Sequence, residues 1–205
     1  MFTGLIREIA TVKNLSASTL SIKSIYKAGI GDSIAINGAC LTVTKLSNDG
    51  FSVELSPESQ KVLAMENYKK EVHIEPAMMM GDKFEGHIVQ GHVDCIGTIK
   101  AIKNSGNSYD VFVEVPKKNI PFIVPKGSIT IDGVSLTVND VNDTIFRLTI
   151  IPHSIKETLF RNYHVGSKVN VETDMFARYV AHIIAHQTKS TSLSWNEVDA
   201  IQASF

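Results

Sequence analysis

Large apolar residues recur at every second position in several short stretches of the chain. Ile34 and Ile36 form one such pair, Ile129 and Ile131 form another, and Val111, Val113 and Val115 form a third run. A period of two is typical of a strand with one buried face. The pattern therefore predicts a fold built from short β-strands.

Turn residues interrupt these runs at matching points. Asn37-Gly38 and Asp132-Gly133 tolerate positive φ, so each predicts a tight turn or bulge. Asn48-Asp49-Gly50 and Val141-Asn142-Asp143 are typical of hairpin loops. Ser56-Pro57 fits a helix start, with Ser as N-cap and Pro in the first turn, and Pro152-His153-Ser154 marks the same short helix further on. Several short strands with one brief helix predict a small closed barrel.

The pattern occurs twice. Residues 33–43 read SIAINGACLTV and residues 128–138 read SITIDGVSLTV, and 11 of the 31 positions in 33–63 are identical 95 residues later (128 − 33 = 95). Flanking stretches match at shifted offsets, with Gly4 falling on Gly91 and VHIE at 72–75 on VNVE at 169–172. We therefore expect tandem units at residues 1–87 and 88–173. Two copies of this length do not form a solenoid, which stacks more and shorter repeats.

The tail at 174–205 has a different period. Apolar residues at 176, 179, 180, 183 and 184 follow helical spacing, and Ser194 to Glu197 fits a capping box. This helix needs a surface to cover, which is either a partner subunit or the chain's own barrels.

Composition narrows the functional classes. The 205 residues carry 20 basic and 21 acidic side chains, so the basic excess of a nucleic-acid binder is absent. No stretch approaches the length of a membrane helix, and the charged N-terminus does not fit a signal peptide. Two cysteines exclude a disulfide-rich scaffold, and the cytoplasm is the expected location.

The copies differ where reactive side chains stand. Cys40 corresponds to Ser135, Asn37 to Asp132 and Ala77 to Asp174, while Thr42 and Thr137 are kept. Two diverged sites would serve two different roles, whereas drift between structural copies is the alternative.

Two Gly-His pairs, Gly86-His87 and Gly91-His92, form a second candidate cluster, since His transfers protons near neutral pH. We expect no metal site, because no Cys or carboxylate stands at ligand spacing beside these residues and the His182/His186 pair lacks the zincin Glu. We also expect no cofactor, since no dinucleotide-binding or P-loop motif occurs.

These motifs resemble the riboflavin synthase family. The similarity begins at MFTG (1–4) and continues through NGACLTV (37–43), GHVD (91–94), KGS (126–128), DGVSLTV (132–138) and VNVE (169–172). It covers the chain up to about residue 187. The paired motifs at one offset are its most specific part.

The resemblance implies an all-β fold of two six-stranded Greek-key barrels followed by a C-terminal α-helix. It implies a homotrimer in which this helix assembles the subunits and each active site lies between the first barrel of one subunit and the second barrel of its neighbour. There, two molecules of 6,7-dimethyl-8-ribityllumazine would stack, and one would give four carbons to the other. The products would be riboflavin and 5-amino-6-ribitylamino-pyrimidinedione. Association with lumazine synthase is left open.

The resemblance also implies site residues. The catalytic candidates are Cys40, His92, Ser135 and Thr137, with His92 as the proton-transfer group. The first-barrel pocket would use Gly4, Leu5, Ile6, Cys40, Leu41, Thr42, Glu54, Leu55, Ser56 and Ser59. The second would use Ser135, Leu136, Thr137, Ile151, Pro152, His153, Ser154, Ile155, Lys156 and Asp174. Gly91, Val93 and Lys126 match further ligand-contacting positions.

Some positions depart from the family pattern. Ala39 replaces a second cysteine, Glu85 a glycine and Gln90 a small residue, and the helix after Ser59 lacks its usual threonines. The competing function is a carrier of the same family, which binds a lumazine or flavin without converting it. A carrier needs one working pocket, so two complete polar sets favour the enzyme.

Overall fold

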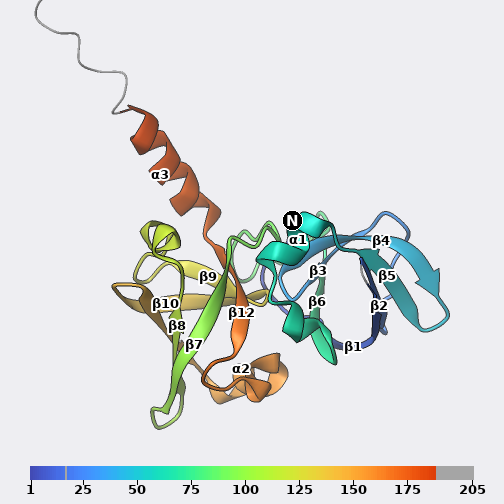
Figure 1. Ribbon diagram of the computed structural model, residues 1–205, viewed down its shortest axis with the longest axis horizontal. Coiled ribbons are helices and arrows are strands. Elements are labelled where there is room, and N and C mark those ends of the chain that lie inside the picture. Colours follow the sequence, from blue (N-terminus) through green and yellow to red (C-terminus); the bar gives the residue numbers. More distant parts are fainter. Residues whose placement is uncertain (17, 188–205) are drawn as a thin grey trace, which may run out of the picture.

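The computed structural model describes residues 1–16 and 18–187 and contains two closed β-barrels of six strands each. The first barrel is formed by β1 (Glu8–Leu15), β2 (Thr19–Lys23), β3 (Ser33–Ile36), β4 (Ala39–Ser47), β5 (Gly50–Glu54) and β6 (Glu71–Pro76). The second is formed by β7 (Cys95–Asn104), β8 (Tyr109–Glu114), β9 (Ser128–Ile131), β10 (Val134–Asn142), β11 (Ile145–Ile150) and β12 (Lys168–Thr173). The barrels lie side by side (Figure 1).

The two barrels have the same strand order. The first runs β1-β2-β5-β4-β3-β6, and the second follows the same path from β7 to β12. All pairings are antiparallel, and β4 and β10 each carry a register shift where they pair with β5 and β11. The structure thus confirms the predicted duplication and the Greek-key barrels.

Each barrel has its own apolar core. The first is built around residues such as Ile22, Val53 and Phe51, and the second around Ile99, Val113 and Phe146, all fully buried. The period of two in the sequence places these side chains inside and their neighbours outside. Burial of this apolar surface is the main stabilising contribution to each barrel.

Short helices follow the barrel strands. α1 (Pro57–Val62) begins as predicted, with the Ser56 hydroxyl accepting the Ser59 N–H and Pro in the first turn. α2 (Pro152–Glu157) occupies the matching place in the second unit. Single 3-10 turns occur at η1 (Met65–Tyr68), η2 (Lys117–Phe122) and η3 (Leu159–Asn162).

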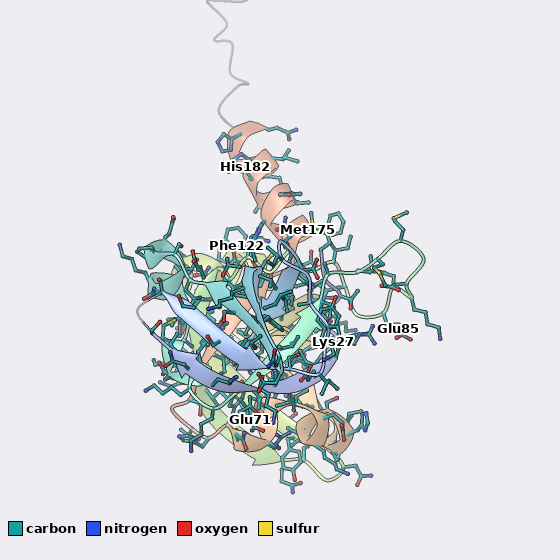
Figure 2. The ribbon with its side chains drawn as sticks, turned by 90° about the vertical axis from the view of Figure 1, so that its right-hand side faces the viewer. Lys27, Glu71, Glu85, Phe122, Met175 and His182 are labelled. Carbon is teal, nitrogen blue, oxygen red and sulfur yellow. The ribbon has the colours of Figure 1, made fainter. Side chains whose placement is uncertain are left out.

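α3 (Met175–Gln187) leaves the end of β12 and projects away from the body (Figure 1). Figure 2 shows Met175 at its base near Phe122, and His182 well beyond the barrels. None of its described side chains is buried, and the predicted apolar positions are more than half exposed, namely Phe176, Tyr179, Val180, Ile183 and Ile184. The capping box at 194–197 lies outside the described residues. No described helix is long and apolar enough to cross a membrane.

The two units meet at their Asn-Gly and Asp-Gly turns. Asn37 and Asp132 both have φ of 45°, and a Cβ added to Gly38 would lie 2.6 Å from the Gly133 nitrogen. Only glycine permits this back-to-back approach. Asn37 and Asp132, expected among the diverged reactive positions, are instead fully buried at this junction.

Asp132 is held there by hydrogen bonds. Its carboxylate accepts the Asn170 N–H at 2.8 Å and the Tyr163 hydroxyl at 2.5 Å. Burial raises the pKa of Asp132 to about 7, and the Tyr163 bond opposes that rise. His73 lies beside it: its Nε2 accepts the Leu159 N–H, so its Nδ1 donates to the Asp132 carbonyl oxygen at 2.8 Å. Burial lowers the pKa of His73 to about 4, so this imidazole is neutral.

Candidate functional site

Two chain segments cross from one unit to the other before each barrel begins. We call residues 2–6 the N-terminal strap and residues 89–93 the linker strap. The straps pair through Phe2 and Val89, whose N–H groups donate to each other's carbonyl oxygens at 2.8 and 3.0 Å. Beyond this bridge each strap reaches the other unit's barrel.

The straps end on the two diverged positions. The Ser135 N–H donates to the Gly4 carbonyl oxygen at 2.8 Å, and the Cys40 N–H donates to the Gly91 carbonyl oxygen at 2.8 Å. Each strap therefore lies against the reactive position of the opposite unit.

Glycine is required at both contacts. Gly4 and Gly91 each have φ of +79°. A Cβ on Gly4 would lie 2.6 Å from the Ser135 Cβ, and one on Gly91 would lie 2.6 Å from the Cys40 Cβ. Any side chain there would displace the strap.

This geometry corrects one sequence-based assignment. Gly4 and Ile6 were expected in the first-barrel pocket, but Gly4 contacts Ser135 and Ile6 packs against the second barrel's core. The assignment failed because the N-terminal strap crosses to the second unit before the chain enters β1.

A buried glutamate holds each strap. Glu75 in β6 accepts the N–H of Thr3 at 2.7 Å and that of Gly4 at 2.9 Å. Glu172 in β12 accepts the N–H groups of Gln90, Gly91 and His92 at 2.8, 2.9 and 3.1 Å. Burial raises the pKa of both carboxyls, that of Glu172 to about 7, and the strap N–H groups oppose the rise. These glutamates were not among the predicted site residues.

The first pocket is a hollow of about 320 Å³ beside Cys40. α1 closes one side, and the linker strap closes another. Seven predicted residues line it together, namely Cys40, Leu41, Ser56, Ser59, Gly91, His92 and Val93. Cys40 is a half-buried free thiol and His92 is exposed. Glu54, Leu55 and Thr42 do not line this hollow, and Leu55 belongs to the barrel core.

The second site is centred on Ser135. The His87 imidazole approaches it, with Nδ1 2.8 Å from the Ser135 Oγ. Burial lowers the pKa of His87, while the negative charge of nearby Asp174 opposes that shift. Sequence reasoning noted the Gly86-His87 pair but did not place His87 in the site.

Other predicted residues lie in α2, on β10 and just before β9. Ile155 packs on the second barrel's core, and the Ser154 carbonyl in α2 accepts the hydroxyl of Thr158, which follows the helix. Thr137 is exposed on β10. Lys126 has a φ of +66°, and the equivalent residue of the first unit is Gly31, which also has a positive φ. The ligand roles of these residues, and of Leu5, Leu136 and Ile151 to Lys156, stay predictions.

The two histidines thus lie at different sites. His92 lies in the hollow beside Cys40, and His87 bonds to Ser135. Among the described residues, no group of three or more His, Cys, Asp or Glu side chains could hold a metal ion.

Comparison with known proteins accounts for the duplicated units. The family model for the lumazine binding domain matches twice, at residues 3–77 and 90–174. The chain belongs to the lumazine-binding-domain family.

Similar members of this family are riboflavin synthases. That of Photobacterium leiognathi is 41% identical over 194 residues, covering 90% of this chain and 89% of the relative. That of Bacillus subtilis is 38% identical over 189 residues, covering 88% of each. The crystal structure of LumP complexed with riboflavin has a TM-score of 0.76 at 22% identity, covering 85% of this chain and 100% of that one, and shows the same fold.

Proposed function

We propose that the chain is a riboflavin synthase that converts two molecules of 6,7-dimethyl-8-ribityllumazine into riboflavin and 5-amino-6-ribitylamino-pyrimidinedione. The observation that carries the proposal is the pair of matched but chemically different pockets, one with Cys40 and His92 and one with Ser135 and His87. One substrate acts as four-carbon donor and the other as acceptor, so the reaction needs two similar ring sites with different polar groups.

The polar groups suit the proton transfers of this reaction. The C7 methyl of the lumazine is acidic because its anion delocalises into the ring, and an imidazole is suited to take that proton near neutral pH. We propose His92 for proton transfer in the first pocket, with Cys40 beside the ring. In the second we propose Ser135, oriented by His87, with Thr137 nearby. Holding two rings in register supplies a further large share of the acceleration, up to about 7–11 kcal/mol in favourable cases.

We also propose a homotrimer in which α3 assembles the subunits and the first pocket of one subunit faces the second pocket of its neighbour. Support comes from α3 itself, whose five large apolar residues are more than half exposed and form one stripe at helical spacing. Light scattering of the chain with and without residues 174–205 tests this. The full chain should have the mass of a trimer, and the shortened chain should have the mass of a single subunit. A shortened chain that stays trimeric would remove α3 from assembly.

Both cysteines are free thiols, which suits a reducing compartment, so we place the enzyme in the cytoplasm.

Turnover tests the activity directly. The purified protein is mixed with 6,7-dimethyl-8-ribityllumazine without additives, and absorbance and fluorescence are followed. We expect catalytic formation of riboflavin, one molecule for each two lumazines consumed. Binding without turnover would assign the chain to the carriers instead.

A further inference from the structure

The linker strap is held by more than its hydrogen bonds to Glu172. Arg178, in the first turns of α3, donates to the Gln90 side-chain oxygen at 2.7 Å and to the Asp94 carboxylate at 2.9 Å. Its guanidinium also lies 3.9 Å from the Glu172 carboxylate. One arginine on α3 therefore contacts residues on both sides of Gly91 and His92, together with the carboxylate that holds them.

Asp94 fixes the far side of this arrangement. Its second oxygen accepts the N–H and the hydroxyl of Thr173, both at 2.7 Å, at the end of β12. The Arg178–Asp94 pair is largely shielded from water, with side chains 23% and 16% exposed. One hydrogen bond joins the pair, and a charge-assisted bond that is shielded in this way is stronger than an exposed surface pair.

The N-terminal strap has a simpler support. Glu75 holds Thr3 and Gly4 as Glu172 holds Gln90 and Gly91, but no described Lys or Arg lies within 4.0 Å of Glu75. The chain after β6 continues as a loop, with Ala77 where Asp174 precedes α3. The two units thus differ in whether a helix contributes to holding the strap.

We propose that Glu172 and Arg178 are positioning residues for Gly91 and His92, and that they make the first pocket depend on the placement of α3. The proposal rests on the proposed function in treating this hollow as a substrate pocket. If α3 assembles the subunits, the same helix adjusts a substrate pocket through a single guanidinium.

The Cys40 thiol reports strap position without any turnover. Gly91 lies directly on Cys40, and Cys95, the other cysteine, is buried with its pKa raised to about 12 by burial. An aromatic disulfide reagent should therefore label Cys40 first, at a rate that rises when the strap opens. Peptide mass spectrometry identifies the labelled residue.

Three variants separate positioning from general loss of stability. Glu172→Gln places an amide N–H against strap N–H groups, and loss of such bonds should raise the Cys40 labelling rate about tenfold. Arg178 is more exposed than Glu172, so Arg178→Met should fold even if Glu172→Gln does not. Arg178→Met should raise the Cys40 labelling rate several-fold, and Arg178→Lys should raise it less. Glu75→Gln, the matched control, should leave the Cys40 rate near that of the wild type.

Steady-state kinetics give the second readout. With the strap displaced, Glu172→Gln and Arg178→Met should lower kcat/KM in the order of their labelling rates. Equal Cys40 labelling in wild type and both variants, or an equal rise in Glu75→Gln, would overturn the proposal. An inactive wild-type protein would overturn the proposed function, while the labelling rates would still test the strap.

Discussion

The sites beside Cys40 and Ser135 differ in their polar side chains and in the contacts that Arg178 of α3 makes to the linker strap, whereas the rest of their support is shared. Both have a glycine at φ of +79° on a crossing strap, a buried glutamate that holds it and a strand order that is identical. Against this common frame, Cys40 and His92 stand in one pocket and Ser135 with His87 in the other. Duplication therefore preserved the arrangement of strap, glycine and glutamate and left different polar side chains beside it.

Removing the imidazole from the first pocket should have the largest effect. His92→Ala should lower kcat by about 10²–10⁴-fold, the usual contribution of a positioned proton-transfer group, while leaving lumazine binding measurable. Fluorescence titration and steady-state kinetics separate the two effects. Full activity in this variant would remove His92 from the mechanism and weaken the contrast between the pockets.

Displacing either strap should lower the activity less than the loss of His92 does, and by a similar factor for the two straps. Gly91→Ala and Gly4→Ala each place a Cβ 2.6 Å from another Cβ, which shifts the strap away from Cys40 or Ser135. A shift of about 1 Å at a reacting site lowers the rate by about 10²-fold, so both variants should lose activity to about that extent. Wild-type kcat/KM in either variant would contradict the role of its strap.

The smallest effect concerns the junction between the units, where Asn37 and Asp132 differ. The folded-state pKa of Asp132 is raised from 3.8 to about 7, so its stabilising contribution is complete below its unfolded pKa and is lost as pH rises toward 7. In Asp132→Asn, the free energy of unfolding should decrease less as the pH rises toward 7. Glu172, whose pKa is also raised to about 7, retains part of the slope, and His73, whose pKa is lowered from 6.5 to about 4, acts in the opposite direction between these two values.

Urea unfolding at about pH 5 and about pH 8 measures this difference. The reciprocal variant Asn37→Asp is the matched control and should steepen the slope, because it places a carboxylate near the Asn67 carbonyl oxygen that Asn37 now contacts. An unchanged slope in Asp132→Asn would show that the junction carboxyl does not titrate between these pH values.

Local and repeated features could be predicted from the sequence. The period of two, the Asn37-Gly38 turn and the Ser56 cap are set by neighbouring residues, so both barrels and α1 could be derived. Repetition then placed Cys40 and Ser135 at equivalent points of the two units.

The crossing of the straps could not be predicted in the same way. Phe2 to Ile6 have no strand or helix period, and the hydrogen bond from Ser135 to Gly4 joins residues far apart in the sequence. The assignment of Gly4 to the first barrel, made from the family resemblance, contained no information on this crossing. A signal for the holding glutamates did exist, since Glu75 and Glu172 are the same ionisable residue at matching positions of the two repeated strands, and both are buried.

A mixing experiment tests most directly the central claim that two unlike pockets from different subunits form each active site. His92→Ala chains are impaired in the first pocket and Ser135→Ala chains in the second, so each alone should have little activity. Co-expressed in one cell and purified as mixed assemblies, they should recover up to about a quarter of wild-type activity, because some interfaces join two intact pockets. Mixed assemblies that form but stay as inactive as either variant would contradict the account.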